Sequence, residues 1–147
     1  SRIMSLKDGK KKMSKSEISD LSRINLTDDK DSIINKIKKA KTDVSPLPSN
    51  IKDLEKRPEA KNLLRIFSSL NNLSLEETIK IFEGKNFSEF KEKLSQVLSE
   101  KLEPISKEIT KLMNEKDFLD KILLDGYKKA NDIASDKVKK MHEIVGF

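Results

Sequence analysis

Apolar residues recur at helical spacing along most of the chain after residue 28. Ile33, Ile34 and Ile37 are assigned to one face of a segment whose other face carries lysines, which predicts a short amphipathic helix ending near Thr42. Pro46 and Pro48 then interrupt the pattern, because proline disfavours helix both at its own position and at the residue before it. Residues 29–50 are therefore expected to form a linking helix and an extended connector.

Two further helices are predicted between residues 58 and 84. Pro58 suits the first turn of a helix, and apolar residues follow it at intervals of three and four. Ser74 and Glu77 have the spacing of a capping box that begins the next helix, and Gly84 is placed to end it in a left-handed conformation. The apolar stripe of the first of these helices comprises Leu63, Ile66, Phe67 and Leu70.

The longest predicted helix begins after Asn86, which has the capping relation to Glu89, and Pro104 is expected to kink or split it. Its stripe comprises Leu94, Leu98, Leu102, Ile105, Ile109 and Leu112. A final helical segment starts near Asp117, where small residues at Gly126, Ala130 and Ala134 would let another helix approach closely. The fold class is thus all-α, with a compact helical unit at 51–147.

Residues 1–28 have no sustained helical period, and they read as a strand end followed by an ordered loop. Positive charge is concentrated near this end of the chain. Residues 1–50 contain 12 Lys and Arg against 7 Asp and Glu, whereas the remainder contains 19 against 18. A basic segment favours phosphate groups or nucleic acid as partners, although a solvated lysine-rich surface is an equal alternative on charge alone.

Composition excludes several classes of protein. The chain has no cysteine, which excludes disulfides and thiolate metal sites or nucleophiles. No apolar run approaches the roughly 20 residues that a membrane helix needs, and no signal-peptide pattern occurs. Carboxylates are abundant but are not grouped at the spacing of metal ligands, so no metal site is expected. A soluble cytoplasmic protein is the expectation.

The stretch with the clearest chemistry is Lys12-Met13-Ser14-Lys15-Ser16, here called the KMSKS pentamer. Two lysines in a serine-bearing loop can place ammonium groups and hydrogen-bond donors around a triphosphate. Cations held near the β and γ phosphates of ATP would stabilise the charge that develops when pyrophosphate leaves. An accidental match in a lysine-rich chain is the competing explanation.

The surroundings of the pentamer resemble those of the KMSKS signature in tryptophanyl-tRNA synthetases, a class I family. Arg2-Ile3-Met4-Ser5-Leu6 precedes the pentamer and Ser22-Arg23-Ile24-Asn25-Leu26 follows it. Further matching stretches lie at residues 38–43, 57–64, 82–85 and 144–147, so the resemblance covers essentially the whole chain. The chain departs from the family in having Glu17-Ile18 where Asp-Pro is common and Gly9-Lys10 where a proline is common, which predicts a more flexible loop.

The resemblance implies a role for each residue of the pentamer. Lys15 would contact the phosphates of ATP, which binds as Mg-ATP, and would stabilise the transition state of activation. Lys12, Met13, Ser14 and Ser16 would shape the loop, and Ile3 would lie against adenine. Residues 1–28 would be the end of a Rossmann-type catalytic domain that is otherwise missing, together with most of the homodimer interface. The fragment alone is therefore expected to be inactive, and His142 is expected to be a surface or helix-end residue.

The resemblance also implies that residues 51–147 bind the anticodon of tRNA(Trp). The basic residues available for the tRNA backbone are Lys128, Lys129, Lys137, Lys139 and Lys140. A solvated helix face neutralised by Asp132 and Asp136 is at least an equal alternative. Most aromatic residues have the spacing of core positions, and a core position is expected for each. The aromatic residues are Phe67, Phe82, Phe87, Phe90, Phe118, Tyr127 and Phe147. The alternatives to a tryptophan–tRNA ligase fragment are a stand-alone basic helical module that binds nucleic acid and a purely structural bundle.

Overall fold

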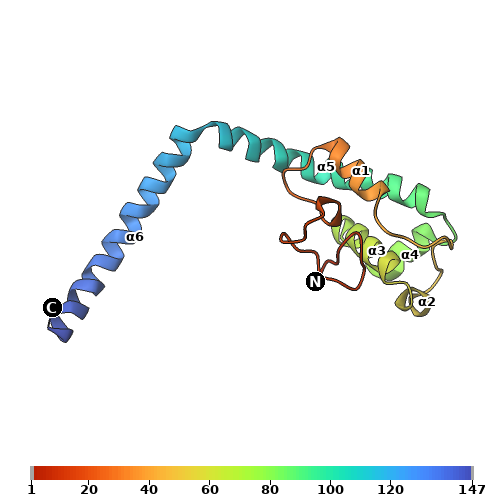
Figure 1. Cartoon of the computed structure of the whole chain (residues 1–147), viewed down its shortest axis with the longest axis horizontal. Helices are drawn as coiled ribbons and strands as arrows, with labels where there is room; N and C mark the ends of the chain where they lie inside the picture. The colour runs from red at the N-terminus through yellow and green to blue at the C-terminus, as the bar shows by residue number, and fades with distance from the viewer. Residues whose placement is uncertain (1, 147) are drawn as a thin grey trace. The chain divides into compact units, whose positions relative to one another are not determined.

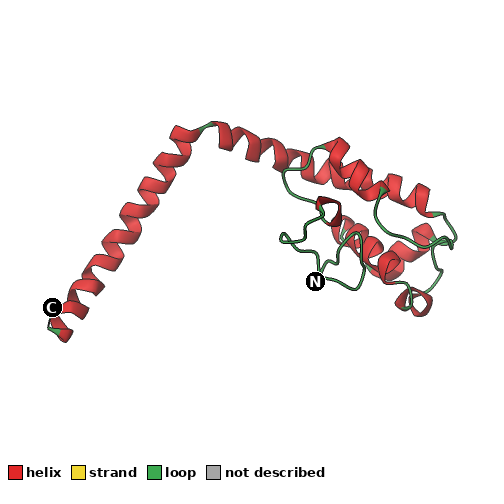
Figure 2. Cartoon of the chain, in the orientation of Figure 1, coloured by secondary structure: helices red, strands yellow, loops and turns green. Residues whose placement is uncertain are grey.

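The computed structural model describes residues 2–146, which divide into two compact units with a boundary after Lys107. Residues 2–146 contain helices, one isolated β-bridge and no β-strand (Figure 2), which confirms the all-α class. None of these helices is long and apolar enough to cross a membrane. The elements are η1 (Asp20–Ser22), α1 (Lys30–Lys38), α2 (Ile51–Glu55), α3 (Pro58–Asn71), α4 (Leu75–Phe82), α5 (Phe87–Asn114) and α6 (Lys116–Val145).

The helix boundaries follow from local capping. Asp29 begins α1 by accepting a hydrogen bond from the Ser32 amide. Pro58 occupies the first turn of α3, and Ser74 with Glu77 forms the predicted capping box of α4. Gly84, with φ of 70°, adopts the predicted left-handed conformation after α4.

One prediction about a helix end is wrong, and one predicted break within a helix is absent. The first helix ends at Lys38 rather than near Thr42. Lys91 of α5 donates to the carbonyl oxygens of Lys38 and Ala40, at 3.2 and 2.6 Å, so contacts from a distant helix end α1 early. Burial lowers the pKa of the Lys91 ammonium. The split that was one of the two outcomes predicted at Pro104 is not seen, since α5 is continuous from Phe87 to Asn114. Pro104 is exposed, so water can bond to the carbonyl group left without a donor.

The core of the first unit lies where α2, α3 and α4 pack against one another and against the start of α5, with α1 beside α5 (Figure 1). Three phenylalanines form its centre. The ring of Phe82 lies 4.8 Å from the rings of Phe67 and Phe90 in edge-on geometry, and Phe67 and Phe90 are 6.1 Å apart. With Phe87, these are the aromatic residues whose predicted core positions are confirmed.

The second unit, from Glu108, contains α6, and no residue of α6 is buried. The predicted core positions of Phe118 and Tyr127 are wrong, since the two side chains are 48% and 66% exposed. Open space surrounds Gly126, so the predicted close approach of another helix is not seen among residues 2–146. Phe147 lies outside the described residues. His142 is exposed in the last turn of α6, as expected for a helix-end residue.

Candidate functional site

The KMSKS pentamer is held by pairing with the segment that precedes it. Met4 and Lys12 form an antiparallel bridge, and the Met13 amide donates to the Ile3 carbonyl oxygen at 3.1 Å. The Ser5 amide donates to the Lys11 carbonyl oxygen at 2.8 Å. The residues before and after the turn thus form a short hairpin, which fixes where the pentamer begins.

Asn62 of α3 anchors this hairpin to the helical core. Its side chain is buried, and its Oδ1 accepts from the Met4 amide at 2.9 Å while its Nδ2 donates to the Met4 carbonyl oxygen at 2.8 Å. One amide side chain therefore satisfies both backbone groups of a residue 58 positions away. The sequence contains no signal for this contact, because Asn62 lies within an otherwise ordinary helical pattern.

Gly9, in the turn of the hairpin, lies against the first turn of α3. A Cβ atom added at Gly9 would be 2.4 Å from the Pro58 carbonyl carbon and 2.6 Å from the Glu59 nitrogen. Backbone atoms at this distance leave no room for a side chain. The glycine that departs from the family pattern therefore makes a close contact in this structure.

We expect Gly9→Ala to lower the free energy of unfolding by about 1–3 kcal/mol, the usual cost of an added methyl group in a packed site. Gly126→Ala is the matched control: nothing lies within 4 Å of its added Cβ, and it should stabilise α6 by about 1 kcal/mol. Urea unfolding followed by circular dichroism measures both. Equal stability of the Gly9 variant and the native chain would contradict the close contact.

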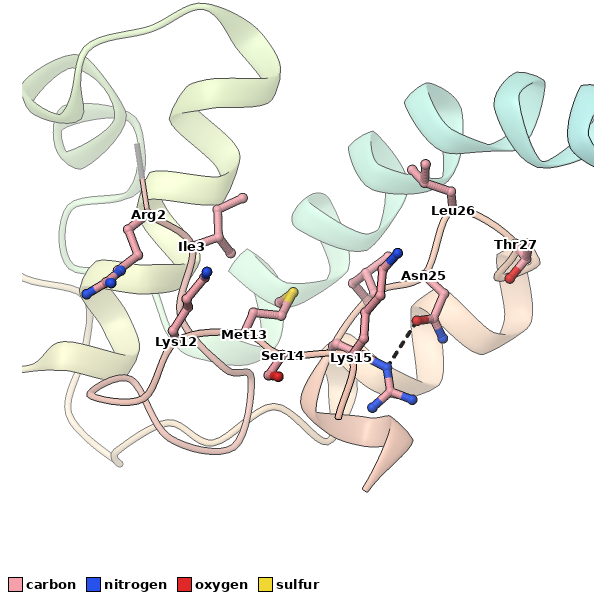
Figure 3. Close-up of a pocket in the computed structure, with 11 residues that line it drawn as sticks. Arg2, Ile3, Lys12, Met13, Ser14, Lys15, Asn25, Leu26 and Thr27 are labelled. Atoms are coloured by element: carbon pink, nitrogen blue, oxygen red, sulfur yellow. Dashed lines mark hydrogen bonds between the residues drawn. The ribbon is translucent and has the colours of Figure 1, made fainter. Parts of the chain in front are cut away.

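The pentamer forms one wall of an open hollow of about 830 Å³ (Figure 3), a volume in the range of small-molecule sites, which is about 300–1,000 Å³. In this view the side chains of Lys12 and Lys15 point the same way, with Met13 between them. The residues that line it are Arg2, Ile3, Lys12, Met13, Ser14, Lys15 and the segment 23–27. The structure thus brings together five of the six residues predicted to bind ATP.

Ser16, the sixth, does not line the hollow but supports the turn. Its hydroxyl lies 2.9 Å from the hydroxyl of Ser14, and its amide donates to the same Ser14 oxygen at 3.3 Å. The four cations at the hollow come from Arg2, Lys12, Lys15 and Arg23. A hollow with these charges and with apolar surface from Ile3, Ile24 and Met13 suits a ligand that combines a flat ring with phosphate groups.

A polar network supports the wall opposite the pentamer, and the sequence analysis did not identify it. Arg23 and Asn25 line the hollow; Arg23 pairs with Asp20, and Asn25 donates to Asp20 and Asp28. Both carboxylates pair with the buried ammonium of Lys36 on α1. The hydrogen bond from Lys36 is the main cause of the lowered pKa of Asp20. One signal was present: Lys36 lies beside Ile37 on the apolar face of α1, and a buried lysine requires carboxylate partners.

The lysines predicted to contact tRNA lie on α6, in the second unit. Lys128, Lys129, Lys137, Lys139 and Lys140 are all exposed. Among residues 2–146 there is no group of three or more histidine, aspartate or glutamate side chains that could hold a metal ion. Exposure alone assigns no role to these lysines, which remain candidates predicted from the sequence.

Comparison with known proteins identifies the family. The sequence profile described as "tRNA synthetases class I (W and Y)" matches residues 1–103. A tryptophan–tRNA ligase of Mesorhizobium japonicum is 48% identical over 145 residues, which are 99% of this chain and 41% of that protein. The corresponding ligase of Rickettsia conorii is 51% identical over 146 residues, 99% of this chain and 44% of that protein.

A solved structure agrees with these relatives. The crystal structure of tryptophanyl-tRNA synthetase from Mycoplasma pneumoniae superposes with a TM-score of 0.59 at 28% identity, over 72% of this chain and 34% of that one. The chain thus spans less than half the length of the relatives it matches. The resemblance indicated by the KMSKS pentamer is confirmed, and the chain belongs to the class I tRNA synthetases (W and Y).

Proposed function

We propose that this chain is the C-terminal part of a tryptophan–tRNA ligase and supplies the loop that binds the phosphates of ATP. The observation that carries the proposal is the hollow in which Lys12 and Lys15 lie with Ile3 and Met13, in a chain whose relatives are named tryptophan–tRNA ligases. The alternative of a stand-alone nucleic-acid-binding module does not explain this combination. The complete enzyme would act in the cytoplasm.

The chemistry of the hollow suits formation of an aminoacyl-adenylate. The carboxylate of tryptophan attacks the α-phosphorus of ATP, and the bond to the β-phosphate oxygen breaks to release pyrophosphate. Lys15 would stabilise the negative charge that grows on the leaving group, as an ammonium group does most effectively where water is excluded. Ile3 would lie against adenine. Magnesium would arrive bound to ATP rather than to dedicated residues of this chain.

The proposal is tested by ATP–pyrophosphate exchange with the full-length protein that contains this chain. Exchange that depends on tryptophan and not on tyrosine is the expected result. Exchange that depends on tyrosine, or no exchange with either amino acid, would refute it. This chain alone should show no exchange, because the proposal places the amino-acid pocket and most of the homodimer interface outside it.

We further propose that α6 contributes to binding the anticodon side of tRNA(Trp) through Lys128, Lys129, Lys137 and Lys140. All four are exposed, and a lysine that contacts a phosphate displaces a counterion when RNA binds. Changing all four to glutamine should weaken the binding of tRNA(Trp) and reduce the dependence of log K on log salt by about 0.7–0.9 for each lost contact.

The matched control changes four exposed lysines of the first unit, Lys52, Lys56, Lys80 and Lys93, to glutamine, so that the net charge falls equally. A titration at two or more salt concentrations with tRNA(Trp), an anticodon-substituted variant and an unrelated tRNA measures both sets. Equal losses of affinity in the two sets of variants would mean that tRNA binding depends only on the net charge of the chain, which would contradict the role of α6. Binding of tRNA(Trp) that is lost on anticodon substitution would support an anticodon-reading unit.

A further inference from the structure

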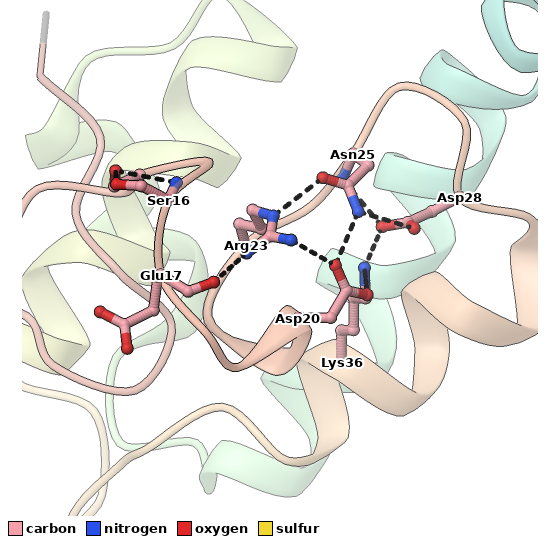
Figure 4. Close-up of polar contacts among 8 residues, drawn as sticks. Ser16, Glu17, Asp20, Arg23, Asn25, Asp28 and Lys36 are labelled. Carbon is pink, nitrogen blue, oxygen red and sulfur yellow. Dashed lines mark hydrogen bonds and ion pairs between the residues drawn. The ribbon is translucent and has the colours of Figure 1, made fainter.

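A network of charged side chains connects the end of the KMSKS pentamer to α1 (Figure 4). The guanidinium of Arg23 donates through one terminal nitrogen to the Glu17 carbonyl oxygen at 2.8 Å, and Glu17 directly follows the pentamer. Its other terminal nitrogen lies 3.0 Å from Oδ1 of Asp20, and its Nε donates to Asn25 Oδ1 at 3.1 Å. All three nitrogens of this guanidinium are therefore bound, which fixes its plane.

The network is anchored by a buried lysine. The Lys36 side chain is 4% exposed, and its ammonium lies 2.6 Å from a carboxylate oxygen of Asp20 and 2.6 Å from one of Asp28. Asp28 also accepts from the Asn25 amide at 2.8 Å, and the Asn25 side chain donates to Asp20 at 3.0 Å. Two cations and two anions balance, so the network adds rigidity at the hollow without a net charge that would repel phosphate.

Apart from the hydrogen bonds between Ser14 and Ser16 and the one from Lys7 to Ser19, little else holds the segment that joins the pentamer to this network. Ser16 and Glu17 are exposed, and Ile18 is completely exposed. Packing therefore contributes little to its conformation, and the bond from Arg23 to the Glu17 carbonyl oxygen acts two residues from Lys15. Since Arg23 and Lys15 line the same hollow, a shift of Arg23 would change both its wall and the position of the lysine.

We propose that Arg23 is a positioning residue that holds Lys15 for phosphate binding, and that Lys36 sets the position of Arg23 through Asp20. The inference rests on the proposed function of the pentamer. It assigns the orientation of the loop to an ionic contact with α1, whereas the hairpin and Asn62 fix only the other end of the pentamer. Without the bond to Glu17, the chain after Ser14 would move more freely and Lys15 would lose its preferred place.

The test compares Arg23→Gln with Arg65→Gln, a variant with the same change of charge at an exposed position of α3. Two quantities are measured on the whole chain: the hydrogen-exchange rates of the amides of residues 15–18 by NMR, and the affinity for ATP by calorimetry. Thermal unfolding of each variant separates loop effects from loss of the fold. Lys36→Met is the second variant, and it should act on the same amides through Asp20.

Arg23→Gln should leave the unfolding temperature near that of Arg65→Gln, speed exchange at residues 15–18, and weaken ATP binding by about tenfold, the scale of one lost hydrogen bond to a charged group. Unchanged exchange at these amides in a folded Arg23 variant would overturn the positioning role, whatever its affinity. A third outcome is that the native chain and both arginine variants bind no ATP, while hydrogen exchange at residues 15–18 is still faster in Arg23→Gln. In that case the positioning role stands, and ATP binding by the isolated chain is refuted.

Lys36→Met tests whether Lys36 acts on the loop indirectly, through Asp20 and Arg23, or only through the stability of the fold. Exchange that increases at residues 15–18 at a temperature where the variant remains folded supports the indirect role of Lys36. Exchange that increases only together with global unfolding would show that Lys36 acts through stability alone and would remove it from the proposal. Arg23→Gln decides the central assignment even if Lys36→Met does not fold.

Discussion

Replacing Phe90 with alanine should lower the free energy of unfolding by about 3–5 kcal/mol, the usual cost of removing a buried phenylalanine ring. Phe90 is 0% exposed and lies edge-on to Phe82, in contact with the cluster that joins α3, α4 and α5. Its loss would leave a cavity at the point where three helices meet. Urea unfolding followed by circular dichroism gives the value.

Phe118→Ala is the matched control, since Phe118 is a phenylalanine on a helix but is 48% exposed. We expect a change within about 1 kcal/mol, as for most surface substitutions. Equal losses at Phe90 and Phe118 would mean that α6 contributes to a core as much as α5 does, and the division into two units would then be wrong.

Replacing Lys15 with alanine should lower the rate of tryptophan-dependent pyrophosphate exchange in the full-length protein by about 100- to 1,000-fold, the effect of removing one group that stabilises transition-state charge. The KM for tryptophan should change little, because the proposed contact of Lys15 is with the phosphates. The Lys15 side chain is exposed at the hollow, so its removal should not destabilise the fold.

Lys11→Ala is the control for Lys15. Lys11 is an exposed lysine of the same loop region and does not line the hollow. The rate of tryptophan-dependent pyrophosphate exchange in the Lys11→Ala variant should remain within a few-fold of the native rate. Equal losses in the two variants would show that general positive charge near the loop matters rather than the position of Lys15.

The features that the sequence predicted correctly are those with local causes. The capping box of Ser74 and Glu77, the first turn at Pro58 and the left-handed Gly84 each depend on neighbours within about four residues. Helices α1, α3 and α5 could likewise be located from their apolar stripes, whereas the short helix α2 was not predicted. Only the pentamer side of the hollow has such a local cause, because Lys12, Met13, Ser14 and Lys15 are adjacent in one loop; the lining by residues 23–27 was not predicted.

The features that were missed depend on residues far apart in the sequence. Asn62 binds Met4, Lys91 binds the carbonyl oxygens at the end of α1, and Asp20 pairs with Lys36. A helical stripe also cannot show what lies against it. The small residues Gly126, Ala130 and Ala134 predicted that another helix packs against α6, yet no residue of α6 is buried in the described part of the chain.

The central claim is that ATP phosphates bind at the KMSKS pentamer, and an NMR titration of this chain with Mg-ATP and with tripolyphosphate tests it most directly. Both ligands should shift the amide signals of Lys12–Ser16, and only ATP should also shift Ile3, which is expected to lie against adenine. Shifts confined to the lysines of α6, or the same small shifts spread over all exposed lysines, would contradict the account.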